Sequence, residues 1–167
     1  FEDAIVPVTD LIGGVDRGWT VGKRLLQFER STHAGINISG SQGGRVESSR
    51  MPETVSRYVS KANGRLSDPA IRRWLTQFEM NAHAQRLTQR RAIEELNSRA
   101  PGFTSSAVKL TNALNIQFGD ELLVAAMGHQ GFRWDPETAD QEELEALQKW
   151  LYQKSLTIAG GTKEVQL

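Results

Sequence analysis

The chain has 167 residues, of which 38% are hydrophobic and 24% are charged, a composition typical of one globular domain with its own core. It contains no cysteine, which excludes disulfides, thiolate-bound zinc, iron–sulfur clusters and a cysteine nucleophile. Twenty Lys and Arg residues balance 20 Asp and Glu residues, and no apolar run is long enough to span a membrane. We therefore expect a cytoplasmic protein that binds neither nucleic acid nor a membrane.

The chain begins at Phe1, with β-branched residues, a proline and then a Leu-Ile-Gly-Gly turn at 11–14. This pattern predicts the end of a strand followed by a turn. Because the chain starts inside such a pattern and lacks an initiator Met, we expect it to be a piece of a longer protein.

After Gly18 the spacing of apolar residues becomes helical and predicts a helix over about 17–38. A Gly/Ser-rich break follows at 39–44. A weaker helix is predicted over about 52–62, with Asn63-Gly64 as its stop.

The clearest helix start is Ser67-Asp68-Pro69, because a polar cap commonly precedes a proline in the first helical turn. An apolar stripe then continues to about Ser98. Further helices are predicted over about 104–127 and 140–156. Gly160-Gly161 break the last of these, and Thr162 could cap another helix that the chain itself does not contain. The pattern predicts an all-α, up-and-down, four-helix-type bundle of about five helices.

Glu29 is the most informative charged residue, because it lies beside the apolar stripe of the first predicted helix. A carboxylate that faces an apolar interior is desolvated, and desolvation raises a carboxylate pKa towards that of a useful general base. The alternative is a structural Glu at the edge of the stripe, paired with an Arg of a neighbouring helix.

Two Glu-x-x-x-His pairs, Glu29/His33 and Glu79/His83, fall on two different predicted helices. Bundle metalloproteins use inward-facing Glu and His, which makes a metal site an alternative. Their usual spacing is Glu-x-x-His, however, so we expect these histidines to be polar-face residues and expect no metal.

Two glycine-containing loops could approach an anion closely. Gly128 and Gly131 follow the 104–127 helix, and Thr162 follows Gly160-Gly161. Each loop has an equally simple interpretation as a helix stop or a cap.

The order of these pieces resembles the C-terminal helical domain of acyl-CoA dehydrogenases. The quoted pieces are Phe1–Val8, Leu11–Gly14 with Gly18-Trp19, Phe28-Glu-Arg30, Gly64–Pro69 with Ile71-Arg72, Lys109, and Gly128–Phe132. The final Ile158-Ala-Gly-Gly-Thr-Lys-Glu-Val-Gln166 resembles the C-terminal signature of that family.

The resemblance implies that residues 1–13 are the end of a preceding β domain with its linker and that 14–167 form the helical domain. It implies an enzyme that binds FAD and an acyl-CoA thioester and introduces a 2,3-double bond. It also implies electron-transfer flavoprotein as the electron acceptor, and a homo- or heterotetramer.

Many family members carry their catalytic base in an Ile-x-Glu-Gly-Thr motif, and the matching position here is Gly160, which cannot abstract a proton. A subset resembling isovaleryl- and long-chain acyl-CoA dehydrogenases keeps the base on the first helix of this domain, just before an Arg. The resemblance therefore implies that Glu29 is the base and that Arg30 supports it.

The family's flavin motif is only partly present, because Ala125 stands where it has a Gln and His129 where it has a Gly. The resemblance still implies that Gly128, Gly131 and Thr162 lie near FAD, which could belong to a neighbouring subunit. The Arg usually found before Gly64 is absent, and Lys61 could supply a cation to the pyrophosphate. An alternative is a non-catalytic partner subunit of a heterotetrameric enzyme.

Overall fold

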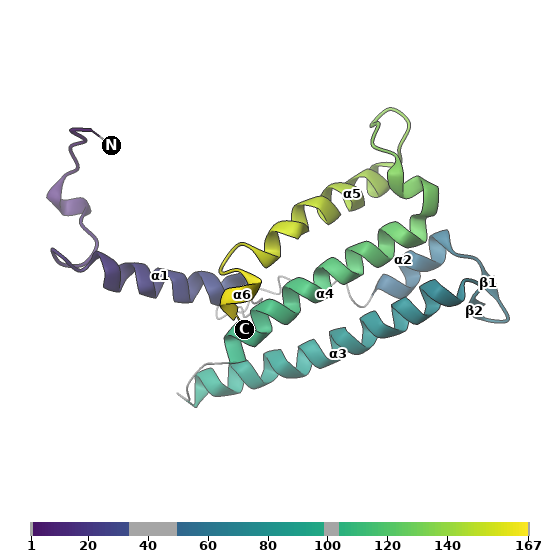
Figure 1. The fold of residues 1–167 in the computed structure, drawn as a ribbon, viewed down its shortest axis with the longest axis horizontal. Helices are drawn as coiled ribbons and strands as arrows, with labels where there is room; N and C mark the ends of the chain where they lie inside the picture. The colour runs from purple at the N-terminus through teal and green to yellow at the C-terminus, as the bar shows by residue number, and fades with distance from the viewer. Residues whose placement is uncertain (1, 34–49, 99–103, 167) are drawn as a thin grey trace.

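The structure is a computed structural model that describes residues 2–33, 50–98 and 104–166. It is dominated by helices, which confirms the all-α prediction (Figure 1). The α-helices are α1 (Gly18–His33), α2 (Met51–Tyr58), α3 (Pro69–Asn97), α4 (Thr104–Met127), α5 (Gln141–Gln153) and α6 (Lys163–Gln166). The shorter elements are the 3-10 helices η1 (Val8–Asp10), η3 (Gly128–Phe132) and η4 (Lys154–Thr157) and the strands β1 (Lys61–Ala62) and β2 (Arg65–Leu66).

The longest helix, α3, begins where its cap predicts. The Asp68 carboxylate accepts hydrogen bonds from the backbone N–H groups of Ala70 and Ile71, at 2.7 and 3.1 Å. These bonds satisfy donors that have no partner within the helix. From this start α3 runs antiparallel to α4, and α2 and α5 complete the bundle around α4 (Figure 1).

The core lies between α2, α3 and α4 and consists of Val55, Val59, Leu66, Ile71, Phe78, Leu122 and Ala126. Trp74 and Phe118 pack at its edge with their ring centroids 5.6 Å apart in an edge-to-face arrangement. Gly119 lets α3 and α4 approach closely, because a Cβ at this position would lie 2.6 Å from the Phe78 ring. Close packing therefore explains a glycine in the middle of a helix.

Several predicted boundaries are corrected by the structure. Residues 61–66 form a hairpin, whereas the prediction continued a helix to residue 62. Asn63 and Gly64 both have positive φ, 52° and 73°, as a two-residue hairpin turn requires.

The two chain ends also differ from the prediction. Residues 2–17 contain no strand, only η1, because neither of the strands in the described part of the chain lies beside them to supply backbone partners. The helix after Thr162 is present as the short α6. The predicted helix end at 34–38 and the Gly/Ser break at 39–44 lie outside the described residues.

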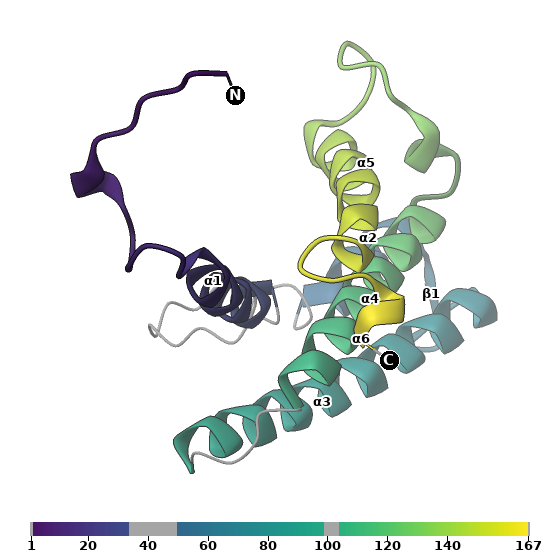
Figure 2. The same cartoon turned by 60° about the vertical axis from the view of Figure 1, so that its left-hand side comes forward.

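Helix α1 stands apart from the bundle and contacts α4 near that helix's N-terminal half (Figure 1). Turning the molecule shows that the segment before α1 leads away from the other helices (Figure 2). Within residues 2–33, 50–98 and 104–166, no helix combines the length and apolar character needed to cross a bilayer.

Candidate functional site

Glu29 lies in the last part of α1 and is half-buried. The apolar residues around it, Leu25, Leu26 and Phe28, are largely exposed, and Leu25 exposes 66% of its surface. The Arg24 guanidinium lies over the Phe28 ring, 5.0 Å from its centroid. The apolar interior expected beside Glu29 is therefore not supplied by the described part of this chain. The prediction for the Arg30 side chain lies outside the described side chains.

The C-terminal glycine loop lies near the same end of α4 (Figure 1). Gly160 and Gly161 have φ of 66° and 105°, which L side chains rarely adopt. The next residue, Thr162, donates a side-chain hydrogen bond to Glu164. A bond from the Glu164 backbone N–H and, as a smaller cause, this bond from Thr162 hold the pKa of the Glu164 carboxyl below its ordinary value. Thr162 thus has a hydrogen-bonding partner within the chain.

Lys109 has no role that its sequence context assigns, although the structure ties it to this loop. Lys109 lies in α4, exposes only 1% of its surface and donates from Nζ to the carbonyl oxygen of Gly161. The signal in the sequence is a lysine between two core residues, Val108 and Leu110. A buried ammonium needs a specific acceptor, so such a position points to a built contact.

The other predicted cofactor residues lie towards the opposite end of α4. Lys61 is exposed on the β1–β2 hairpin. Gly128 ends α4 with a φ of 60°, and nothing lies within 4 Å of where a Cβ would be. Gly131 is buried, and a Cβ there would lie 2.8 Å from the carbonyl oxygen of Val124. Packing within the chain therefore requires Gly131 to be a glycine.

The predicted site residues thus form two groups at the two ends of α4. Helix α1, which carries Glu29, and α6, which follows Thr162, lie at one end of α4, and the β1–β2 hairpin, which carries Lys61, lies towards the other (Figures 1 and 2). Gly128 and Gly131 belong to η3, which directly follows α4 at this second end. A helix of 24 residues is about 36 Å long at about 1.5 Å per residue. One copy of the described chain therefore does not bring the two groups into one site.

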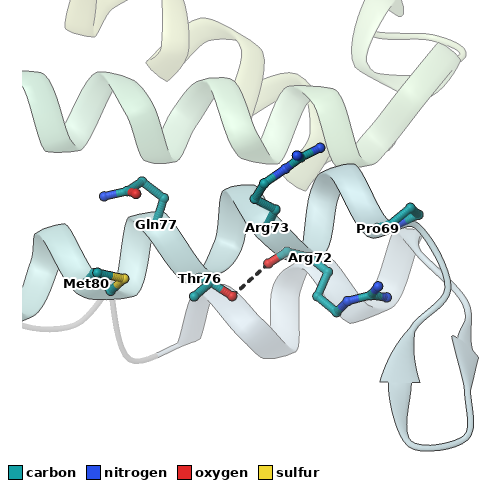
Figure 3. Close-up of a pocket in the computed structure, with 6 residues that line it drawn as sticks. All are labelled: Pro69, Arg72, Arg73, Thr76, Gln77 and Met80. Atoms are coloured by element: carbon teal, nitrogen blue, oxygen red, sulfur yellow. Dashed lines mark hydrogen bonds between the residues drawn. The ribbon is translucent and has the colours of Figure 1, made fainter.

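Surface hollows of the chain lie elsewhere. Figure 3 shows one of about 530 Å³ that is lined by residues of a single face of α3: Pro69, Arg72, Arg73, Thr76, Gln77 and Met80. Arg72 donates to the carbonyl oxygen of Leu66 at 2.5 Å, and the Thr76 hydroxyl donates to the carbonyl oxygen of Arg72 at 2.9 Å. A hollow on one helix face, without converging groups from other elements, lacks the usual features of a catalytic site.

A second hollow, of about 500 Å³, lies between α3 and α4 and is lined by amide, hydroxyl and apolar side chains of the two helices. Neither hollow contains Glu29 or the glycine loop. Among the described residues no group of three or more His, Asp or Glu side chains could hold a metal ion. The Glu79/His83 pair on α3 therefore has no further ligands in that part of the chain.

Comparison with models of protein families identifies the family to which the chain is related. The family model for the acyl-CoA dehydrogenase C-terminal domain matches residues 16–167. The chain belongs to the acyl-CoA dehydrogenase family. The match confirms, at the level of the family, the resemblance seen in the sequence. Acyl-CoA dehydrogenases are oxidoreductases of lipid metabolism and generally bind FAD. A search of curated proteins gave no match.

Proposed function

We propose that this chain is the C-terminal helical domain of an FAD-dependent acyl-CoA dehydrogenase in which Glu29 removes the α-proton of an acyl-CoA thioester. The observation that carries the proposal is the family match over 16–167 in a chain that has Gly160 where many members have their base. Glu29 is a half-buried carboxylate on a helix of the same domain. Residues 1–13 would then belong to the preceding β domain and its linker.

In this reaction the α-C–H electrons form the new C=C bond while the β-hydrogen leaves as a hydride. The Glu29 carboxylate accepts the α-proton, and Arg30 supports the carboxylate. Bound FAD would supply the hydride acceptor. The exposed apolar side chains of α1, Leu25 and Phe28, would exclude water from the acyl group once the rest of the protein covers them.

The cofactor residues fit FAD unequally. Lys61 offers an exposed cation to a pyrophosphate, and Gly128 leaves open space. Gly131 and Thr162 each have a role within the chain, so their identity does not require a ligand. Because the two groups lie at opposite ends of α4, we propose that each contacts a different FAD molecule, one of them shared with a neighbouring subunit. This arrangement requires at least two subunits; we propose a tetramer, homo- or heteromeric, whose flavin electron-transfer flavoprotein would reoxidise.

A second candidate is a non-catalytic partner subunit of a heterotetramer. It is favoured by the departures at Ala125 and His129, where the family's flavin motif has a Gln and a Gly. In that case this chain would stabilise the assembly, and a partner chain would provide the base.

The test is Glu29→Gln in the full-length enzyme, with flavin reduction by the thioester followed in a stopped-flow instrument. Loss of a general base is expected to slow reduction about a thousandfold while FAD and the fold remain. Glu79→Gln is a matched control, because Glu79 is also a half-buried helical carboxylate. Near-normal reduction in Glu29→Gln, with FAD bound, would remove Glu29 from the mechanism and favour the partner subunit.

A double variant asks whether the base moved from the position of Gly160. Glu29→Gly together with Gly160→Glu should recover part of the activity that Glu29→Gly loses, because both positions must reach one α-proton. Recovery should be partial, since the φ of 66° at Gly160 adds a backbone strain of about 1 kcal/mol or more. A double variant no faster than Glu29→Gly, while still binding FAD and substrate, would contradict relocation.

A further inference from the structure

The segment that follows α5 is ordered without an apolar core of its own. None of residues 154–165 is fully buried; Leu156 is half-buried, and Ile158 and Val165 are largely exposed. The segment nevertheless holds two glycines at positive φ and the short α6. Since apolar burial is small in this segment, polar contacts with the bundle carry much of what fixes its conformation.

The first part of the segment is fixed by two side chains of α4. Gln117 donates from Nε2 to the carbonyl oxygen of Gln153 at 2.9 Å and lies 3.4 Å from that of Lys154. Lys154 forms an ion pair with Glu121. Both contacts hold the end of α5 and the start of η4 against α4, several residues before the glycine loop.

The glycine loop has a different anchor. The Lys109 ammonium lies at the other end of the segment and donates to the Gly161 carbonyl, across 52 positions of sequence. The Lys154 side chain is partly exposed, whereas Lys109 is almost fully buried. A desolvated ammonium interacts more strongly with a carbonyl dipole than a solvated one does, so this bond constrains the loop more than a surface contact would.

We propose that Lys109 is a positioning residue: its buried ammonium holds the Gly161 carbonyl and thereby sets the conformation of Gly160, Gly161 and Thr162. The last step, from loop conformation to catalysis, rests on the proposed function, in which this loop borders the flavin and the thioester. Lys109 itself touches neither. Its effect on the reaction passes through the loop.

Lys109 fills space in the bundle and also holds the loop through its ammonium, and one substitution can separate these two roles. Methionine has a similar length and no charge, and Lys109 lies between the core residues Val108 and Leu110. Methionine removes the cost of burying an ammonium, and it leaves the Gly161 carbonyl without its Nζ donor, a loss that falls on the loop. Lys109→Met should therefore release the loop while α3 and α4 stay folded.

The experiment measures hydrogen exchange by mass spectrometry in the full-length, FAD-loaded protein. Lys109→Met should speed exchange in peptides covering 158–166 at least tenfold, with peptides of α3 unchanged. The rate of flavin reduction at saturating thioester should fall about tenfold, with the thioester Kd within twofold of wild type. Lys109→Arg should restore protection in part, because a guanidinium can still donate to the carbonyl.

Lys154→Met is the matched control, because it removes a lysine that contacts α4 outside the glycine loop. It should leave exchange at 160–162 near the wild-type rate. Unchanged exchange at the loop in Lys109→Met would overturn the proposal, and so would faster exchange throughout the protein, which indicates a structural role alone. Faster loop exchange with normal flavin reduction would overturn the positioning role.

If Lys109→Met does not fold, the same contact is tested from its acceptor side. In a chain ending at Ala159, which lacks the Gly161 carbonyl, Lys109→Arg should lower the melting temperature by less than half of what it does in the full chain. An equal effect in both chains would overturn the proposal. The exchange and melting measurements do not depend on catalysis, so they remain decisive even if wild type shows no dehydrogenation and the proposed function fails.

Discussion

Helices α1 and α3 both carry an apolar stripe, but the chain buries only one of them. Ile71, Phe78 and Ala82 of α3 are buried against neighbouring elements. In α1 the corresponding large side chains, Leu25 and Phe28 among them, are exposed. The two helices therefore differ in their surroundings far more than in their pattern.

The difference comes from how each helix meets α4. Helix α3 lies along α4, whereas α1 touches α4 near one end and otherwise stands apart (Figure 1). Periodicity thus identifies the face of a helix that is suited to burial, but not the partner that buries it. For α1 we propose that the partner is the rest of the acyl-CoA dehydrogenase, including the thioester.

The largest stability effect should come from truncating a core side chain. Leu122→Ala in α4 should lower the free energy of unfolding of the 167-residue chain by about 3 kcal/mol, because the residue is fully buried and leaves a cavity. Leu25→Ala in α1 makes the same chemical change at an exposed position and should stay within about 0.5 kcal/mol. Urea unfolding followed by circular dichroism measures both. Equal losses would mean that α1 is packed as tightly as the core.

Two helical glycines should respond with opposite signs. Gly119→Ala places a Cβ 2.6 Å from the Phe78 ring, and the overpacking should destabilise the chain by about 1–2 kcal/mol. Gly22→Ala in α1 meets nothing within 4 Å and should stabilise the chain by about 0.5–1 kcal/mol through helix propensity. Thermal unfolding of the two variants side by side gives the signs. A stabilising Gly119→Ala would contradict the close approach of α3 and α4.

A smaller, pH-dependent effect should mark the junction of α3 and α4. The Thr104 hydroxyl and the Arg91 guanidinium donate hydrogen bonds to the Glu95 carboxylate, and the Thr104 bond is the larger cause of a lowered pKa for Glu95. A lowered carboxylate pKa contributes stability above the unfolded pKa of 4.5, and this contribution is lost as the pH falls through the lower folded value.

Thr104→Val should therefore lower the melting temperature at pH 7 and have less effect at pH 3. Thr76→Val is the control, because the Thr76 hydroxyl bonds only its own helix among the contacts described. An effect of Thr104→Val that is independent of pH would argue against the role assigned to this bond.

The smallest effect should be on Tyr58 in α2. Burial raises its pKa above 10.0, and the nearby charge of Glu143 on α5 raises it further. Glu143→Gln should lower the Tyr58 pKa, measured from tyrosinate absorbance in a Tyr152→Phe background, since the chain has two tyrosines. The raised pKa of Tyr58 contributes stability below pH 10.0, and this contribution is lost as the pH rises through the folded pKa of Tyr58. An unchanged Tyr58 pKa in Glu143→Gln would mean that the charge of Glu143 on α5 does not act on Tyr58.

Strong local signals were sufficient for much of the fold. The bounds of α4 agree with the prediction, because an apolar repeat ends at a glycine with positive φ, Gly128. The hairpin at 61–66 was mistaken for the end of a helix, although Asn63-Gly64 is also a strong signal for a two-residue turn. Two-residue strands carry too little pattern to decide between these interpretations.

The candidate site was less predictable than the fold. Glu29 was identified from its place beside an apolar stripe, and its catalytic role stays a prediction. Lys109 enters the sequence pattern only as part of the family resemblance, and its contact with Gly161 joins positions 52 residues apart. No local pattern contains such a contact.

By itself the sequence determined the helical class, the capped start of α3 and the family, because caps, periodicity and short motifs are properties of neighbouring residues. Only the tertiary structure decided which stripe is buried, why Gly119 and Gly131 must be glycines, and which carbonyl receives the Lys109 ammonium. These features depend on distances between segments far apart in the chain. Such distances are fixed when α3, α4 and the C-terminal segment pack together, since burial and hydrogen bonding act through space and not along the sequence.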